Sequence, residues 1–289
     1  LDADSTARQR FLREAQAASA LNHPSIVTIY DLISQPDADY LVMEYLDGCP
    51  LSNLIAKSGM PMGQALHYAI EAASALQAAH EAQIVHRDIK PSNVFVMQRG
   101  HVKILDFGVA KLSREAEDKD ATRSMDLTET GSFLGTPLYA APEQLMAEPH
   151  DWRTDIFSFG VMLYEMLTGD RPFQGGSRFA ILNEVVSGKP RRLRETHPHL
   201  PQELDDLVFQ MLARHKEDRP ASMNEVAVRL SAISTGGTTA LAVTQMMRAA
   251  VQVPSTGSGK PLTSPPAQGS ERISIAVLPL RSLSPDPDD

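Results

Sequence analysis

The spacing of apolar residues along this chain predicts a mainly helical protein with a smaller amount of sheet. Several segments show the spacing of three to four residues that is typical of amphipathic helices. They cover residues 8–21, 51–57, 63–81, 155–167, 179–186, 202–213 and 223–233. Segment 155–167 is apolar nearly all round, so we expect a central, buried helix that ends at Gly169.

Shorter apolar runs predict strands between and around these helices. The runs cover residues 26–33, 40–45, 94–97, 102–105 and 273–280. The pair Arg99-Gly100 separates two of them and is a hairpin signal. With both helical segments and strand-like runs along the chain, we expect an α+β fold.

Polar segments without periodicity divide the chain. Residues 111–135 are rich in charged and hydroxyl side chains and predict a mobile loop. Residues 234–270 are rich in Gly, Thr, Ser and Pro and predict a flexible linker. The character of the chain also changes at Asp47, so the expected parts are 1–46, 47–233, 234–270 and 271–289.

Composition excludes several classes of protein. The chain has 289 residues, of which 42% are hydrophobic, enough for one sizeable core plus a tail or partial second domain. The net charge of −9 argues against a nucleic-acid partner. A single cysteine, Cys49, excludes an internal disulfide and fits a reducing compartment. With no apolar run long enough to span a membrane, we expect a cytoplasmic protein; an anchor outside this segment is compatible with that expectation.

Polar residues between 88 and 106 carry the candidate chemistry. The Asp88 carboxylate, in a loop before a strand, can orient an attacking hydroxyl or accept its proton. Asn93 and Asp106 offer oxygen ligands that suit Mg²⁺. Lys90 can neutralise charge on a phosphoryl group in transfer. Taken singly, these residues could be a helix cap and ordinary turn residues; together they predict phosphoryl transfer from a metal-bound nucleotide.

These residues resemble the catalytic and metal-binding loops of protein kinases. The resemblance covers residues 1–233 and is carried by His86-Arg87-Asp88-Ile89-Lys90-Pro91-Ser92-Asn93, Asp106-Phe107-Gly108, 135–143, 154–160 and Asp218-Arg219-Pro220. Lys90 and Gly135-Thr136-Pro137 favour the Ser/Thr branch, and 11–27 and 40–48 resemble bacterial, eukaryotic-like Ser/Thr kinases. The resemblance implies a two-lobe fold, with 1–46 as a partial N-lobe and 47–233 as a mainly helical C-lobe.

The resemblance also implies a nucleotide site that takes ATP with Mg²⁺ or Mn²⁺. The backbone of Glu44 and Leu46 would bond adenine, with Met43 at the back of the pocket and Phe95 beneath the base. A strand in the core would by itself explain Met43 and Phe95 through packing alone. The catalytic pair would be Asp88 and Lys90, and the metal ligands would be Asn93 and Asp106.

Other residues receive structural roles from the resemblance. Glu143 would pair with Arg219, Asp155 would hold the catalytic loop, and His86 would pack beneath Phe107, which precedes Gly108. Metal ligation by His86 is the alternative that we disfavour, since no partner has ligand spacing. Glu14 stands where the family's helix glutamate pairs with a lysine that contacts the nucleotide.

Arg87 beside Asp88 suggests regulation by phosphorylation, because a phosphate would give this cation a partner. The candidate acceptors are Thr128, Thr130 and Ser132. Alternatively, these hydroxyls only solvate the loop. Thr136 would bond Asp88 and Lys90 and help to admit a Ser/Thr protein substrate. Self-association for autophosphorylation is a further expected partnership.

The chain departs from the family pattern in the segment before Glu14. No glycine-rich phosphate hairpin precedes Glu14, and no lysine precedes Lys57. We favour a fragment of a longer kinase, inactive and poorly stable alone, whose sheet has an exposed edge beside strand 40–45. The alternatives are a pseudokinase that scaffolds and, more remotely, a metal-dependent hydrolase. Residues 273–280 resemble the first strand of a TolB-like domain, so 271–289 would begin a truncated downstream domain.

Overall fold

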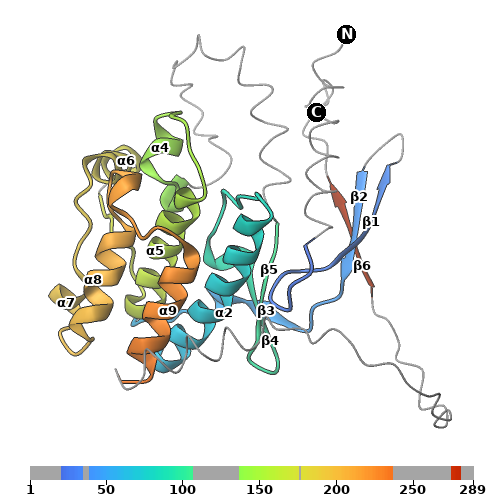
Figure 1. Cartoon of the computed structure of the whole chain (residues 1–289), viewed down its shortest axis with the longest axis horizontal. Coiled ribbons are helices and arrows are strands. Elements are labelled where there is room, and N and C mark those ends of the chain that lie inside the picture. Colours follow the sequence, from blue (N-terminus) through green and yellow to red (C-terminus); the bar gives the residue numbers. More distant parts are fainter. Residues whose placement is uncertain (1–20, 35–38, 107–136, 176, 237–274, 281–289) are drawn as a thin grey trace, which may run out of the picture.

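The computed structural model describes residues 21–34, 39–106, 137–175, 177–236 and 275–280. Within these ranges, a helical part contains α2 and α4 to α9, and two small sheets lie beside it (Figure 1). The loop 111–135, most of the linker 234–270 and all of the expected helix 8–21 except Leu21 lie outside the described residues. No helix in the described ranges has the length and apolarity needed to cross a bilayer.

The first sheet has the strand order β1-β2-β6, with both pairs antiparallel. It contains β1 (Ile29–Ser34), β2 (Asp39–Glu44) and β6 (Ile275–Leu280). The register between β2 and β6 runs from Asp39 opposite Leu280 to Glu44 opposite Ile275. The edge of β2 that we expected to be exposed is therefore covered, because an apolar run distant in sequence supplies the missing backbone partners.

The second sheet is a hairpin extended by one short strand, in the order β3-β4-β5. It contains β3 (Gly48–Pro50), β4 (Val94–Met97) and β5 (Val102–Ile104). Alternate residues of β4 and β5 are buried against the helices, whereas Phe95 and Lys103 are half-buried on the opposite face. This alternation is the two-residue period of a strand with one face in the core. The hairpin predicted around Arg99-Gly100 is confirmed.

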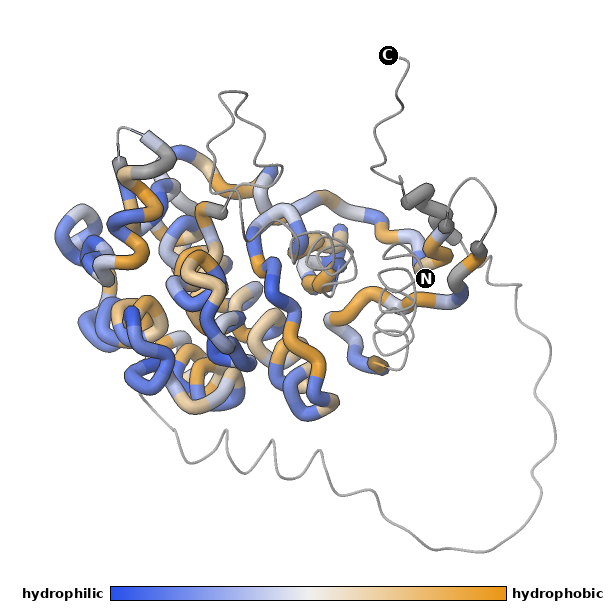
Figure 2. Tube along the Cα trace, turned by 90° about the horizontal axis from the view of Figure 1, so that it is seen from above, coloured by the Kyte–Doolittle hydropathy of each residue, from blue (hydrophilic) through white to orange (hydrophobic). Residues whose placement is uncertain are grey.

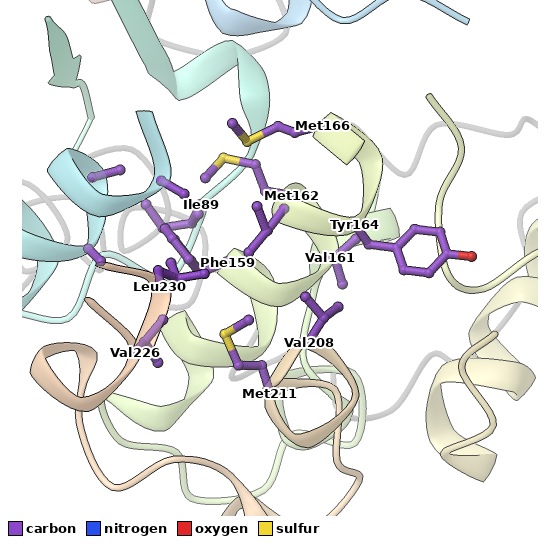
Figure 3. Packing of buried hydrophobic residues seen from close by; sticks show 14 of the residues in the cluster. Ile89, Phe159, Val161, Met162, Tyr164, Met166, Val208, Met211, Val226 and Leu230 are labelled. Carbon is purple, nitrogen blue, oxygen red and sulfur yellow. The ribbon is translucent and has the colours of Figure 1, made fainter. Parts of the chain in front are cut away.

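The helical part is built around α5 (Arg153–Thr168), which is buried over nearly its whole length. Around it are α2 (Met62–Glu81), α4 (Pro142–Leu145), α6 (Arg178–Ser187), α7 (Leu193–Thr196), α8 (Gln202–Met211) and α9 (Met223–Ser234). Side chains from α5, α8 and α9 pack together in the core (Figure 3). Hydrophobic and hydrophilic stretches alternate along these helices (Figure 2).

The predicted helices at 63–81, 155–167, 179–186, 202–213 and 223–233 are confirmed, with small shifts at their ends. The end of α5 is also as predicted, because Gly169 adopts a left-handed conformation with φ 76°. The predicted helix at 51–57 is wrong. Only the single 3-10 turn Leu51–Asn53 forms there, since the segment between Pro50 and Gly59 is too short for a helix to propagate.

Candidate active site

The loop that carries Asp88 connects α2 to β4, and the hairpin then returns the chain to the same place. Val94 pairs with Ile104 across the hairpin. The Leu105 amide donates to the Asn93 carbonyl at 2.9 Å. Asp106 follows Leu105 directly, so the hairpin register brings the loop of Asp88 and Asn93 to the end of β5. This arrangement matches the proximity that the phosphoryl-transfer hypothesis requires.

Asp88 is the acceptor in a compact network within its own loop. Its Oδ2 accepts from Lys90 Nζ at 2.7 Å and from Asn93 Nδ2 at 3.1 Å. The same Asn93 amide donates to the Asp88 backbone carbonyl at 2.9 Å. The side chains of Asp88 and Lys90 remain 29% and 32% exposed, so a protein hydroxyl can approach both.

Asn93 is suited to hold a hard cation because its amide nitrogen is committed to Asp88. Its Oδ1 accepts only a long contact of 3.4 Å from Ser92 Oγ among the described residues. One such amide oxygen and the Asp106 carboxylate are a sufficient protein contribution for Mg²⁺, which fills its shell with phosphate oxygens and water. The described residues contain no cluster of three or more His, Cys, Asp or Glu with metal-site geometry.

His86 links the Asp88 loop to the segment that joins β5 to Asp106. Its Nε2 lies 2.7 Å from the Leu105 carbonyl, and its Nδ1 accepts from the Asp88 amide at 3.3 Å. These contacts assign the proton to Nε2, because a carbonyl can only accept. Burial lowers the pKa of His86, so the ring is neutral. The contact expected with Phe107 lies outside the described residues.

Asp155, near the start of α5, fixes the backbone before Asp88. Its Oδ1 accepts from the Arg87 amide at 2.7 Å, and its Oδ2 accepts from the His86 amide at 2.8 Å. His80 Nε2, on α2, lies 2.8 Å from the same Oδ2. Burial alone would raise the pKa of Asp155, but these hydrogen bonds and the neighbouring histidines hold it below its usual range.

Two residues of the site adopt left-handed backbone conformations that their side chains disfavour. Arg87 has φ 65° and Asp106 has φ 54°. Such conformations cost about 1–3 kcal/mol and persist where surrounding contacts over-determine them. At Arg87 the determining contacts are the hydrogen bond to Asp155 and the one from Gln144 Nε2 to the Arg87 carbonyl, at 3.0 Å.

Ile89 anchors the loop in the helical core. It is fully buried and lies in the same cluster as Phe159 and Met162 of α5 (Figure 3). Its neighbours Asp88 and Lys90 remain partly exposed. An apolar anchor between two polar residues thus holds their side chains at the surface without the need for a rigid helix.

Glu143 and Arg219 form a buried, bidentate ion pair beneath the site. Arg219 Nη1 and Nη2 donate to the two carboxylate oxygens of Glu143 at 2.7 and 2.8 Å. The remaining guanidinium hydrogens go to the carbonyls of Ala213, Arg153 and Arg214. Burial opposes ionisation, yet the Arg219 charge holds the pKa of Glu143 below its ordinary value.

Two further residues near the site, Gln144 and Glu165, could not be predicted from the sequence pattern. Gln144 donates to the Arg87 carbonyl and its Oε1 accepts from the Ala141 amide at 3.0 Å, which joins α4 to the Asp88 loop. Glu165, on α5, accepts a short hydrogen bond from the Tyr139 hydroxyl. Both Tyr139 and Glu165 line a cavity of about 220 Å³ that Lys90 and Ser92 also border. Only the cavity's position beside Lys90 relates it to the candidate chemistry.

The residues expected around adenine lie at the end of β2 and on the hairpin. Met43 is buried and packs with Val27 and Leu41, with Leu46 and Leu105 against the same cluster. Glu44 ends β2, and Phe95 is half-buried on the face of β4 that points away from the helical core. The expected residues Glu14, Phe107, Gly108, Thr128, Thr130, Ser132 and Thr136 lie outside the described residues.

Comparison with known sequences identifies one family. The family model for the protein kinase domain matches residues 2–229. The serine/threonine-protein kinase PknB of Mycobacterium leprae is 37% identical over 232 residues, which cover 78% of this chain and 36% of that protein. A probable serine/threonine-protein kinase of Streptomyces coelicolor is 37% identical over 239 residues, covering 81% and 34%. The chain thus spans about a third of the length of these curated relatives.

Comparison with solved structures supports the same architecture. The crystal structure of Rad53 residues 1–466 in complex with AMP-PNP matches with a TM-score of 0.62 and 23% identity. The match covers 75% of this chain and 53% of that one. At this identity the likeness establishes the fold, and it agrees with the expected arrangement of a small sheet-containing part and a helical part.

Proposed function

Because the chain belongs to the protein kinase family, we propose that the full-length protein is a bacterial, eukaryotic-like kinase that transfers the γ-phosphoryl group of ATP to Ser or Thr hydroxyls of proteins. The observation that carries the proposal is the network at Asp88. Lys90 and Asn93 both donate to its carboxylate, and the backbone bond from Leu105 to Asn93 supports a position of Asp106 near the same loop.

In this proposal each side chain has one task. Asp88 orients the substrate hydroxyl and accepts its proton. Lys90 neutralises charge on the phosphoryl oxygens. Asn93 and Asp106 would hold Mg²⁺ or Mn²⁺ through their oxygens. When bound, the metal–ATP complex supplies the phosphoryl group and neutralises its negative charge. The Asp155 and His86 contacts keep the Asp88 loop in register, so these groups need not reorganise during transfer.

The adenine would lie between the end of β2 and the hairpin. The backbone of Glu44 and Leu46 would bond its edge, Met43 would close the back of the pocket, and Phe95 would support the base. This chain has no lysine before Lys57 and no glycine-rich hairpin before Glu14. We therefore propose that the 289-residue chain alone transfers phosphate poorly.

Regulation would act through the segment before Pro137. A phosphate on Thr128, Thr130 or Ser132 would bring negative charge toward Arg87, and transfer between two copies would supply this phosphate. Thr136 would help to admit the substrate hydroxyl. Protein substrates, self-association and a cytoplasmic location all belong to this proposal; the single cysteine of the chain fits a reducing compartment.

A scaffolding pseudokinase is the second candidate, favoured only by the missing lysine. The test measures phosphate transfer from Mg²⁺–ATP by the full-length protein, with Asp88→Asn as the catalytic variant. Asp206→Asn is the matched control, since Asp206 is an exposed carboxylate paired with Arg192 far from Asp88 in the sequence. We expect Asp88→Asn to lose at least about 100-fold in kcat. Equal activity of wild type and Asp88→Asn, or no transfer by wild type, would reject the enzyme and leave the scaffold.

A further inference from the structure

Lys103 has no part in the proposed transfer of the phosphoryl group. It lies in the middle of β5, between the buried residues Val102 and Ile104. Across the hairpin it stands directly opposite Phe95. Residues directly opposite each other in an antiparallel pair project from the same face. Lys103 and Phe95 therefore share the face of the hairpin that is turned away from the helical core.

The ammonium group of Lys103 connects two segments that are remote in the sequence. Its Nζ donates to Glu44 Oε1 at 2.5 Å and to the Ile26 carbonyl at 3.2 Å. The same Glu44 oxygen accepts from the Thr28 amide at 2.7 Å, and the Glu44 amide donates to the Thr28 carbonyl at 2.9 Å. Lys103 thus holds the end of β2 and the segment before β1 against β5.

Backbone contacts already join part of this arrangement without Lys103. The Val27 amide donates to the Ile104 carbonyl at 3.0 Å, and the Ile104 amide donates to the Ser25 carbonyl at 2.9 Å. Segment 25–27 would therefore stay on β5 if the lysine were replaced. Within the described residues no backbone hydrogen bond joins Glu44 to β5, so the Lys103 side chain is its direct link to the hairpin.

The surroundings of the Lys103–Glu44 ion pair favour a strong interaction. The side chains of Lys103 and Glu44 are only 17% and 20% exposed, so solvent screens them less than an open surface pair. A charge-assisted hydrogen bond is about twice as strong as a neutral one. The Glu44 oxygen is also fixed by the Thr28 amide, which limits the ways in which the carboxylate can rearrange.

We propose that Lys103 is a positioning residue for the nucleotide: through Glu44 it sets the distance and orientation of the end of β2 relative to Phe95. The inference rests on the proposed function, in which the backbone of Glu44 and Leu46 meets the edge of adenine and Phe95 meets its face. Without Lys103 the two surfaces of the adenine site can move apart, and the nucleotide dissociates faster.

Nucleotide binding and phosphoryl transfer depend on different contacts. Asp88, Asn93 and Asp106 are held by Asp155, His86 and the hairpin register, whereas the Lys103 ammonium bonds to Glu44 and to the Ile26 carbonyl. Loss of Lys103 is therefore expected to raise the KM for ATP and to leave kcat nearly unchanged. A lysine that instead contacted the phosphates would, when removed, lower kcat strongly.

The test uses the full-length protein and compares Lys103→Met with Lys103→Arg, which keeps the charge and most of the reach. Lys216→Met is the matched control. Lys216 donates to the Pro149 carbonyl at 2.8 Å and lies 3.8 Å from an Asp151 carboxylate oxygen, so it loses similar contacts in the helical part. The measurements are the dissociation constant for Mg²⁺–ATP, kcat and KM for ATP, and amide hydrogen exchange over residues 40–46.

For Lys103→Met we expect about a 10-fold weaker affinity for Mg²⁺–ATP, corresponding to about 1.4 kcal/mol, with kcat within about twofold. Exchange over 40–46 should become faster. Lys103→Arg should recover most of the affinity, and Lys216→Met should match wild type. Adding Glu44→Gln to Lys103→Met should cause little further loss, because the two residues act as one pair.

Unchanged affinity and unchanged exchange in Lys103→Met would overturn the inference, and so would a loss confined to kcat. A wild-type protein that binds no Mg²⁺–ATP would reject the proposed function instead. In that case the exchange measurement still decides whether Lys103 restrains the end of β2.

Discussion

The His86 imidazole lies 2.7 Å from the Leu105 carbonyl and, through that bond, connects the Asp88 loop to the segment between β5 and Asp106. Its other nitrogen accepts from the Asp88 amide, so a single side chain fixes both halves of the candidate site. This arrangement requires a neutral ring, because a protonated Nδ1 could not accept from an amide. The consequence is a dependence of stability on pH.

Stability is expected to fall as the pH drops below about 6.5, the pKa of an unperturbed histidine. Burial lowers the pKa of His86 in the folded protein, so below this pH the unfolded chain binds the proton more readily. The contribution of the neutral ring is thus present above the unfolded pKa and is lost as the pH decreases. Burial, together with the charge of Lys103, also lowers the pKa of His23, which acts in the same direction.

The measurement is the free energy of unfolding at several pH values between about 5 and 7. His86→Gln should be less stable than wild type at neutral pH and should show a weaker loss toward pH 5. His67→Gln is the control, because the His67 side chain is 53% exposed. An equally steep pH dependence in His86→Gln would show that another group is responsible.

Arg219→Ala should lower the free energy of unfolding by about 3–5 kcal/mol, since it leaves the buried Glu143 carboxylate without its cation. Denaturant unfolding of the full-length protein or of its kinase domain measures this loss. Arg229→Ala removes an ion pair of the same chemical type, but Arg229 and Glu225 are 35% and 39% exposed. The control should therefore change stability by no more than about 1 kcal/mol. Similar losses in both variants would contradict the special role of the buried pair.

The sequence indicated candidate site residues where the pattern is local, and it did not indicate residues whose contacts are remote in the chain. Asp88, Lys90 and Asn93 stand within one loop, so their types and spacing alone indicated phosphoryl transfer. Gln144 and Lys103 carry no such pattern, because each acquires its role by reaching a residue more than fifty positions away. The left-handed conformation of Arg87 could not be predicted either, because arginine has no preference for it.

The same distinction holds for the fold. Helices α2 and α5 were predicted because each buries a long periodic or wholly apolar surface. The turn at Leu51–Asn53 was mistaken for a helix, since a few apolar residues at helical spacing do not reveal how soon a chain must turn. The pairing of β6 with β2 joins segments separated by most of the chain, and an apolar run alone does not name its partner.

Gly160→Ala should be destabilising by about 1–3 kcal/mol, although alanine is the better helix former. A Cβ at Gly160 would lie 2.9 Å from the Met211 Cβ and 3.3 Å from the Leu212 Cδ2, in the contact between α5 and α8. Gly63→Ala is the opposite case, because a Cβ there meets nothing within 4 Å. Thermal unfolding should show a lower midpoint for Gly160→Ala and an equal or higher one for Gly63→Ala. A higher unfolding midpoint for Gly160→Ala would contradict this prediction, because it would mean that α8 shifts to make room for the added methyl group at little cost.

Tyr139→Phe should destabilise the protein, because the hydroxyl donates to the half-buried Glu165 carboxylate. Burial and this hydrogen bond raise the pKa of Tyr139, so the phenol stays protonated and keeps its donor over the whole neutral range. Its loss should cost about 1–3 kcal/mol, which is the usual penalty for leaving a buried polar group without its partner. Denaturant unfolding of Tyr139→Phe checks the value.

The double variant Tyr139→Phe/Glu165→Gln separates charge from packing. Glutamine has nearly the shape of glutamate but no charge, so the side chain at position 165 costs less free energy to bury without its hydrogen-bond donor. We expect the double variant to be more stable than Tyr139→Phe alone, whereas Glu165→Gln in the wild-type background should be destabilising. Because both side chains border the cavity beside Lys90, the KM for a protein substrate should be measured with the same variants. Simple additivity of the two substitutions would exclude a direct Tyr139–Glu165 coupling, since residues that share a hydrogen bond are non-additive.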